Sequence, residues 1–363
     1  MGLGLGIDYA LLMVNRFREE IHHGKSVEDS VVTTMATAGK TVFYSGLTVL
    51  VTMVSLTFFP LPFLKSFGYA GVSVVALAVV GAIIGLPPIL ALMGHRIDKG
   101  VIRKSAITPK EEGRWADTAR FVMKRPTAIV ILSLIVLGIM ASPIQNIKFA
   151  QGDSRMLPAS NPAAIATALQ SERFPGQTGT PIEIITFDGS TKLDEIATYS
   201  QEIAKVSGVM SVLPPQVIGE DVRVIAYQSM LPRTPEAQKL IHDIRDIKAP
   251  SGTLIGGVAA DYTDSQDGIS STLPWALGWI ALSVLVLIFI FTGSIILPIK
   301  AVLLNVLSLA ATMGVLTWVF IDGNLQWLVG DFTLTGTLDT SIVILIAVVV
   351  FGLSMDYELF LLS

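Results

Sequence analysis

Six long apolar runs divide the chain, and each is close to or above the length that crosses a bilayer as a helix, about 17–25 residues. The runs are Val42–Phe59, Phe67–Met93, Ala128–Ile144, Leu273–Phe291, Ile295–Ile321 and Leu338–Leu362. A seventh run, Met1–Val14, is shorter and contains Asp8, so we interpret it as the end of a further span. The last run ends at Ser363 without a flanking charge. We therefore expect a fragment of a longer transporter-like protein.

The composition agrees with a membrane protein. Hydrophobic residues make up 52% of the chain and charged residues 15%, whereas about 25% charged residues is usual in soluble domains. This excludes an ordinary soluble enzyme and a disordered chain. The net charge of −4 gives no reason to expect a nucleic-acid partner. The lack of cysteine excludes thiol chemistry, and the histidines show no metal-ligand spacing, so we expect neither a metal nor a cofactor.

The distribution of Lys and Arg predicts the topology. Basic residues follow the first run, crowd the linker 95–126 and recur at Lys300, while the intervening loops hold only Lys65. Short basic loops stay in the cytoplasm. The predicted domains are therefore membrane helices at 1–144 with the cytoplasmic linker 95–126, an outer domain at 145–272, and membrane helices at 273–363. Within the linker, Glu111–Lys124 predicts either a helix on the membrane surface or a short solvated helix.

The outer domain alternates strands and amphipathic helices. Strands are predicted at Pro181–Phe187, Val209–Leu213, Val222–Tyr227 and Thr253–Ile255, and helices at Asp194–Val206 and Pro235–Ile247. The order β-α-β-β-α-β is that of the split βαβ, ferredoxin-like unit. The sequence therefore predicts a polytopic α-helical membrane protein with an extracytoplasmic α+β domain. Such a unit serves many functions, so it does not identify a substrate.

An internal repeat is the most informative feature. The segment GLGIDYAL from Gly4 aligns with GLSMDYEL from Gly352 at an offset of 348 residues, and Gly, Leu, Asp, Tyr and the final Leu match. Both copies lie in apolar runs predicted to cross from outside to inside. An ionised Asp at the centre of a bilayer costs about 2.5–3.5 kcal/mol or more. A repeated cost of this kind indicates a function for Asp8 and Asp356.

Proton transfer is the function that this chemistry favours. In each copy the Gly lies four residues before the Asp and shares its helix face, so a small residue lets a partner helix approach. If the two helices meet, burial and like charge favour protonation of one carboxyl. We expect Asp8, Tyr9, Asp356 and Tyr357 to form a proton relay. The candidate neighbours of this relay are Asn15, Ser45 and Thr48, and Glu358 is a weaker candidate near the inner end. The alternative to a relay is a purely structural hydrogen bond between the two helices.

Several segments resemble the MmpL branch of the resistance-nodulation-division (RND) superfamily. They are GIDYALLMVNRFREE (Gly6–Glu20), FGLSMDYELFLLS (Phe351–Ser363), FTGSIILPIKA (Phe291–Ala301) and MGVLTWVFIDG (Met313–Gly323). The resemblance covers nearly the whole chain. MGVLTWVFIDG and VMKRP (Val122–Pro126) are most similar to the members that export trehalose monomycolate.

The resemblance implies a plasma-membrane secondary transporter rather than an enzyme, with twelve membrane helices and two periplasmic porter domains. This chain would extend from helix 4 to helix 10 and contain the second porter domain. The two Asp-Tyr pairs would be the proton relay of the family. The implied function is proton-motive-force-driven export of cell-envelope lipids, such as a trehalose monomycolate-like glycolipid, with accessory envelope proteins or oligomerisation as further partners. Efflux of drugs or other small hydrophobic molecules, a non-transporting lipid-sensing scaffold and an inactive fragment remain alternatives.

Overall fold

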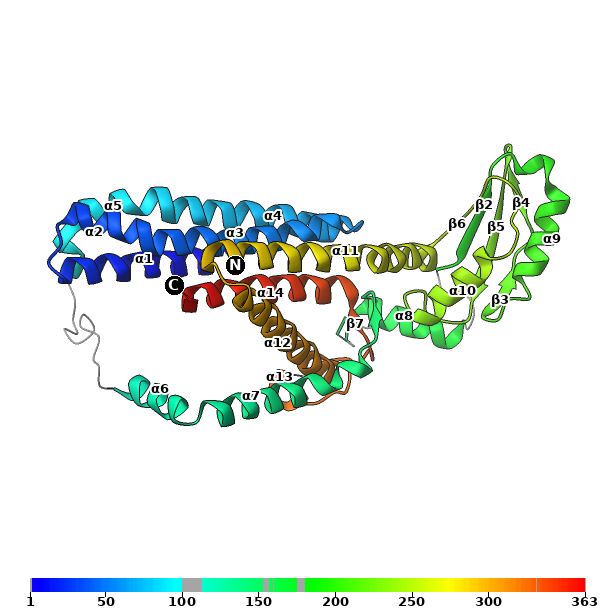
Figure 1. Ribbon diagram of the computed structural model, residues 1–363. Helices are drawn as coiled ribbons and strands as arrows, with labels where there is room; N and C mark the ends of the chain where they lie inside the picture. The colour runs from blue at the N-terminus through cyan, green and yellow to red at the C-terminus, as the bar shows by residue number, and fades with distance from the viewer. Residues whose placement is uncertain are drawn as a thin grey trace. The chain divides into compact units, whose positions relative to one another are not determined.

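The computed structural model describes residues 2–99, 113–152, 157–158, 160–174, 180–330 and 332–362. Two compact units account for the chain. The membrane unit contains Met1–Ile144, Pro274–Val315 and Leu345–Ser363, and the α+β unit contains Gln145–Leu273 and Leu316–Ile344. Figure 1 shows the elements of both units.

The membrane unit is built from helices. They are α1 (Gly2–His22), α2 (Val27–Thr34), α3 (Lys40–Val54), α4 (Pro62–Val80), α5 (Leu86–Met93), α6 (Arg114–Lys124) and α7 (Pro126–Ala141), together with parts of α11 (Val258–Thr292), α12 (Ile296–Phe320) and α14 (Thr340–Leu362). Short π-helical turns at Met35–Gly39 and Gly81–Gly85 join α2 to α3 and α4 to α5. The Ser26 side chain caps α2 by accepting a hydrogen bond from the Asp29 amide. Pro62 and Pro126 begin α4 and α7, where the amide proton that proline lacks would have no partner in the helix.

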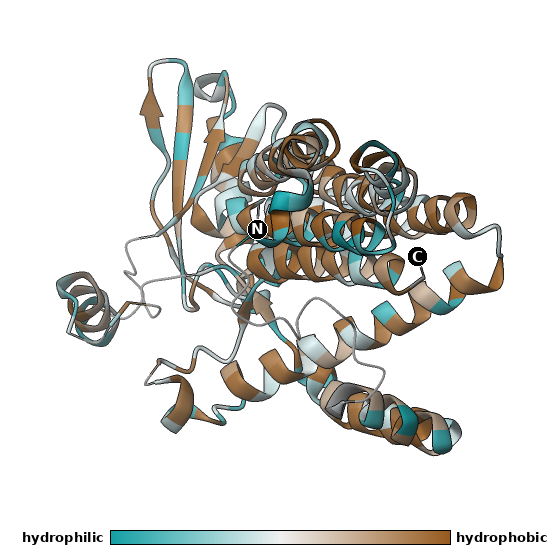
Figure 2. Ribbon diagram, turned by 90° about the vertical axis from the view of Figure 1, so that its left-hand side faces the viewer, coloured by the Kyte–Doolittle hydropathy of each residue, from teal (hydrophilic) through white to brown (hydrophobic). Residues whose placement is uncertain are grey.

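Among the described residues, six helical stretches are long and apolar enough to cross a membrane, in agreement with the six long runs. They are Val27–Phe58, Pro62–Asp98, Pro126–Asn146, Val258–Thr292, Ile296–Phe320 and Thr340–Leu361. Several extend further than the sequence predicts, because polar helical turns continue an apolar span at its end. Hydrophobic residues predominate along the long helices, whose ribbons are mostly brown in Figure 2. In α7 no described side chain is buried within the protein, as expected for a helix whose surface faces lipid.

The α+β unit contains a five-stranded sheet. Its strands are β2 (Ile182–Thr186), β3 (Val209–Val212), β4 (Gln216–Ile218), β5 (Asp221–Gln228) and β6 (Thr253–Gly256). The order is β3-β5-β2-β6 with antiparallel neighbours, and β4 also pairs with β5. Ile184 lies opposite Val224 on one side and Ile255 on the other.

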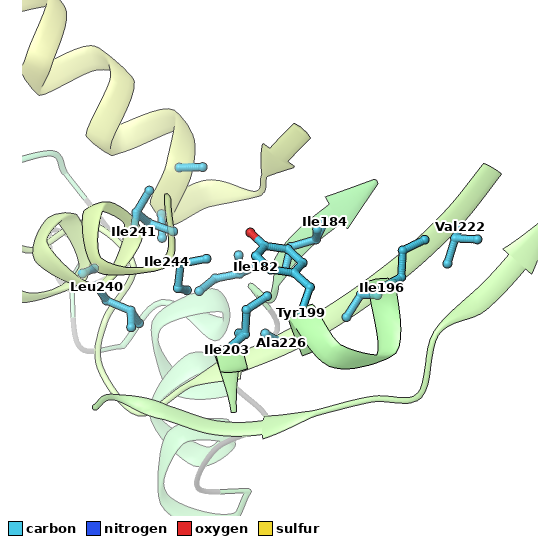
Figure 3. Close-up of a cluster of buried hydrophobic side chains, with 14 residues drawn as sticks. Ile182, Ile184, Ile196, Tyr199, Ile203, Val222, Ala226, Leu240, Ile241 and Ile244 are labelled. Carbon is cyan, nitrogen blue, oxygen red and sulfur yellow. The ribbon is translucent and has the colours of Figure 1, made fainter. Parts of the chain in front are cut away.

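One face of this sheet carries the core of the unit. Along β5 buried and half-buried residues alternate, so that Val222, Val224 and Ala226 face inward. Helices α9 (Leu193–Ile203) and α10 (Pro235–Arg245) cover these residues with one apolar side each, including Tyr199 and Ile244 (Figure 3). The predicted strands and helices are confirmed to within a few residues at their ends.

Other elements of this unit are absent from the sequence prediction. They are β4, helix α8 (Pro162–Arg173), the short helix α13 (Gln326–Val329) and the two-residue strands β1 (Phe149–Ala150) and β7 (Leu338–Asp339), which pair in parallel. The pair β1/β7 joins segments almost 190 residues apart, and the Asp339 carboxylate accepts from the Gly152 amide. All of these elements except α8 have two to four residues, and segments this short have no detectable periodicity. The predicted linker helix Glu111–Lys124 is observed as α6 from Arg114, while Glu111 and Glu112 lie outside the described residues.

Candidate functional site

The two copies of the Asp-Tyr motif meet in the membrane unit. Tyr357 on α14 donates a hydrogen bond from its hydroxyl to the carboxylate of Asp8 on α1, at 2.9 Å, across 349 residues of chain. The ring of Phe360 makes edge contacts with the rings of both Tyr9 and Tyr357, with centroids 6.2 and 6.1 Å apart. The beginning of α1 and the end of α14 therefore share one polar and aromatic contact.

Asp356 is the buried carboxyl of this contact. Asp356 is only 1% exposed. Its Oδ1 has no hydrogen-bond partner among the described residues. The charges of Asp356 and Asp8 are near enough to interact. An unpaired buried carboxylate oxygen is costly, whereas a proton on it removes the charge. The geometry is therefore suited to binding a proton.

Tyr9 is fully buried and contacts a hydroxyl of α3. Ser45 donates to the Tyr9 hydroxyl at 3.4 Å, and both residues have 0% exposure. Thus Ser45 lies beside the Asp-Tyr pairs, as the sequence predicts for a neighbour. Thr48 is also buried, but its hydroxyl donates to the Tyr44 carbonyl of its own helix at 2.9 Å.

Ser45 and Thr48 belong to a longer row of hydroxyls along α3 and its C-terminal turn. The row consists of the buried residues Thr41, Ser45, Thr48, Thr52 and Ser55. Thr52 and Ser55 donate to the carbonyls of Val49 and Thr52. These two residues and Thr41 are not among the neighbours predicted from the sequence. Their spacing of four, three, four and three residues along one helix face is the signal that identifies the row.

The two motif glycines have different environments. The expectation that each lets a partner helix approach holds for Gly352 and is wrong for Gly4 in this chain. A Cβ on Gly352 would lie 2.5 Å from the Thr52 hydroxyl, so a small residue lets α14 approach α3 there. A Cβ on Gly4 would have no described atom within 4 Å. Gly4 therefore makes no close helix contact among the described residues, because its face of α1 is exposed in this chain.

The remaining candidates lie away from these contacts. Asn15 is exposed on α1, seven residues beyond Asp8, which corresponds to about 10 Å along a helix. Glu358 is half-buried on α14 and lies close enough to the charge of Lys300 to interact with it. In the described part of the chain no cluster of His, Asp and Glu could hold a metal ion.

A cluster of ion pairs lies at the C-terminal end of α1. Glu20 is buried and pairs with Arg16 at 2.6 Å and with Lys25 at 2.7 Å. The hydrogen bond from Lys25 lowers the pKa of Glu20 below its ordinary value, and the charge of Arg16 adds to this effect. Asp98 pairs with Arg18 at 2.8 Å and with His22 at 3.0 Å. These ion pairs hold the end of α1 against the residues that follow α5.

The spans and the buried carboxyl define a multi-pass membrane protein with a polar site between its helices. Residues 1–129 and 155–363 match the model of the MMPL family, and the chain belongs to that family. It is 36% identical to the membrane protein SCO6666 of Streptomyces coelicolor, with all of this chain and 50% of that protein aligned.

Two further relatives have names that state a transported lipid. The chain is 30% identical to the trehalose monomycolate exporter MmpL3 of Mycobacterium tuberculosis, covering 43% of it. It is 31% identical to the mycolic acid-containing lipids exporter MmpL11 of Mycolicibacterium smegmatis, covering 40% of it. In both alignments all of this chain is covered. The chain thus spans half or less of the length of these relatives.

Proposed function

We propose that this chain is the central part of a proton-motive-force-driven exporter of cell-envelope lipids, a secondary transporter of the RND type. Family membership and the lipids named for MmpL3 and MmpL11 support lipid export. A trehalose monomycolate-like glycolipid is the proposed substrate. The helices and domains of the remaining half of such a protein complete the transport path.

The buried Asp356 beside the Asp8–Tyr357 hydrogen bond is the observation that carries proton coupling. Asp356 takes up the proton, since its Oδ1 is buried and has no described partner. Asp8 is the second carboxyl and is held by the Tyr357 hydroxyl, while Tyr9 and Ser45 position the buried side of the site. Uptake neutralises a charge between α1 and α14, which changes the preferred packing of the two helices.

Release of the proton to the inner side completes the cycle. A proton that crosses the membrane potential contributes about 2.3 kcal/mol per 100 mV. Repeated changes in helix packing transmit this free energy to the α+β unit, which passes lipid outward. The structural hydrogen-bond alternative lacks this coupling, and it predicts that neutral isosteres of Asp356 support normal transport.

We also propose that the α+β unit is a ferredoxin-like porter domain outside the cytoplasm, and that the chain is organised as 1–144, 145–272 and 273–363. The antiparallel order β3-β5-β2-β6 with α9 and α10 on one face supports this assignment. The distribution of basic residues between the apolar runs supports the orientation in the plasma membrane.

The function is tested with the full-length protein in proteoliposomes with an imposed proton gradient. Labelled trehalose monomycolate is the substrate, and its transfer across the membrane is measured together with the internal pH. We expect Asp356→Asn and Asp8→Asn to abolish both coupled signals while the protein still folds and inserts. Asp322→Asn, in the loop after α12, is the matched control and keeps wild-type rates.

Other outcomes identify the alternatives. Wild-type rates in both relay variants would exclude the proton relay. Proton-coupled transfer of unrelated hydrophobic drugs, without transfer of the lipid, would indicate small-molecule efflux. A wild-type protein that moves neither protons nor lipid would indicate a scaffold.

A further inference from the structure

The side chain of Asp339 fixes the first turn of helix α14 to the α+β unit. One carboxylate oxygen accepts from the Gly152 amide at 3.0 Å, and the other accepts from the Ile342 amide at 3.1 Å. Ile342 belongs to the first turn of α14, whereas Gly152 lies just after strand β1. Hydrogen bonds to a charged acceptor are about twice as strong as neutral ones. Asp339 therefore connects the start of α14 to the segment that follows β1.

Neighbouring contacts reinforce this connection. Strand β7, which ends at Asp339, pairs with β1. The Thr340 hydroxyl donates to the side-chain oxygen of Gln266 on α11 at 3.1 Å, and the Tyr262 hydroxyl of the same helix donates to a carbonyl of β1 at 3.3 Å. Arg233 donates to the carbonyl of Gly152, so charged side chains bind both backbone groups of this glycine. The start of α14 is thus anchored to several segments of the α+β unit.

Helix α14 joins this anchor to the Asp-Tyr site. Asp356 follows Thr340 by 16 residues, which corresponds to about 24 Å along a helix. Residues 341–351 contain neither glycine nor proline, where most helix kinks arise. Helix α11, in contrast, contains Pro274 in its interior. Helix α14 is therefore suited to transmit a displacement from one of its ends to the other.

We propose that Asp339 is a positioning residue for transport, which transmits the displacement of α14 at Asp356 to the α+β unit. This inference rests on the proposed function, because it takes the protonation of Asp356 as the event that changes helix packing. When the connection through Asp339 is broken, Asp356 still takes up protons. The movement of α14 is then absorbed at its first turn and reaches β1 only in part.

The variant Asp339→Asn breaks the connection without removing the side chain. A carboxamide has a single oxygen, so Asn accepts one of the two amides and loses the other. Transfer of labelled trehalose monomycolate and the internal pH are measured together for the full-length protein in proteoliposomes with an imposed proton gradient. We expect the ratio of lipid transferred to protons taken up to fall about fivefold. The infrared band of the protonated Asp356 carboxyl should keep its wild-type intensity.

Asp221→Asn is the matched control. It removes the same charge from the same unit, but Asp221 accepts the Asp188 amide through one oxygen, at 3.1 Å, and Asn retains this bond. Asp221 lies in β5, which has no connection of this kind to α14 among the described residues. The control should keep the wild-type ratio.

A covalent link in place of Asp339 tests whether the connection itself matters. Phe149 and Leu338 are partners in the β1/β7 pair. Neighbouring strands are about 4.7–4.9 Å apart, within the range of about 4.4–6.8 Å between the Cα atoms of a disulfide. Because the sequence contains no cysteine, Phe149→Cys and Leu338→Cys are added to Asp339→Asn, with any cysteines outside residues 1–363 replaced. We expect oxidation to restore the wild-type ratio and reduction to lower it about fivefold again.

Three results would overturn the inference. A wild-type ratio in Asp339→Asn would show that this connection does not carry the movement. Equal losses of proton uptake and lipid transfer, with a weaker Asp356 band, would assign Asp339 a role in stability alone. A low ratio that oxidation does not restore would assign the effect to the lost charge. A wild-type protein that moves lipid without taking up protons would contradict the proposed function, and this inference with it.

Discussion

The two copies of the Gly-Leu-x-x-Asp-Tyr motif have nearly the same sequence but opposite environments. In the copy on α14 the Asp is buried and the Tyr is 54% exposed. In the copy on α1 the Asp is half-buried and the Tyr is fully buried. The exposed Tyr357 reaches across to Asp8, whereas Tyr9 is directed to Ser45.

This difference shows that a repeated sequence does not imply two equivalent sites. Each Asp-Tyr pair contributes one buried and one more accessible group, so a single asymmetric site is formed from both copies. The asymmetry follows from the neighbours. Residues near Asp356 pack against α3, where Gly352 meets Thr52, whereas Gly4 has no such neighbour among the described residues.

The largest expected difference comes from lengthening each carboxyl side chain. Asp356→Glu adds a methylene group to a buried position, which costs about 1–3 kcal/mol of overpacking and moves the carboxyl away from its neighbours. We expect transport in proteoliposomes to fall at least about tenfold. Asp8→Glu has room at its half-buried position and should keep most of its activity. Equal losses in the two variants would contradict the asymmetry.

The next difference concerns the two glycines. Gly352→Ala places a methyl group against the Thr52 hydroxyl, and we expect it to destabilise the protein by about 1–3 kcal/mol. Gly4→Ala enters open space and replaces a poor helix former, so its effect should be neutral or slightly stabilising. Thermal unfolding in detergent measures both. A double variant Gly352→Ala with Thr52→Ala, which removes the hydroxyl at the contact, should recover part of the loss.

Removing the two hydroxyls separates structure from transport. Tyr9→Phe deletes a buried hydrogen-bonded group, and about 1 kcal/mol of stability should be lost. Tyr357→Phe deletes an exposed hydroxyl and should leave the unfolding temperature almost unchanged. It should still slow coupled transport, because Asp8 loses its donor. The reverse pattern, a stable Tyr9→Phe and an unstable Tyr357→Phe, would indicate that the burial of the two phenols is wrongly assigned.

The smallest effect is expected at the charged end of α1, which lies beyond the motif. Because the folded-state pKa of Glu20 is lowered from its ordinary value of 4.5, its ion pairs stabilise the protein fully above that value. This contribution is lost as the pH falls through the lower folded-state pKa. Thermal unfolding between neutral and strongly acidic pH should therefore show a steeper acid loss in the wild type than in Glu20→Gln. Parallel curves would show that Glu20 has no such role.

Much of this fold was predictable because the hydrophobic patterns of its helices and strands extend over many residues. The six apolar runs correspond to the six candidate spans found in the described part of the chain. The alternation in β5 and the apolar side of α10 also extend over enough residues to be recognised. The pairing of β1 with β7 was not predictable, since two residues carry no period and their partners are far apart in sequence. The extension of α11 back to Val258 was also missed, because its first turns are polar.

The candidate site was predictable in its residues but not in its arrangement. The repeat identifies Asp8 and Asp356, and the structure brings their helices together. Packing against α3 determines which of the two Asp residues is buried, and the motif itself contains no information about that packing. Thr52 and Ser55 were missed because hydroxyls are common in membrane helices, and only their regular spacing distinguishes them.

Infrared difference spectroscopy of the full-length protein tests most directly whether Asp356 binds the transported proton. Spectra are recorded on either side of a pH step, and the stretching band of a protonated carboxyl is followed. We expect a carboxyl band that is present in the wild type to disappear in Asp356→Asn and to persist in Asp8→Asn. A band that persists in Asp356→Asn and disappears in Asp8→Asn would contradict this expectation and assign the proton to the other copy of the motif.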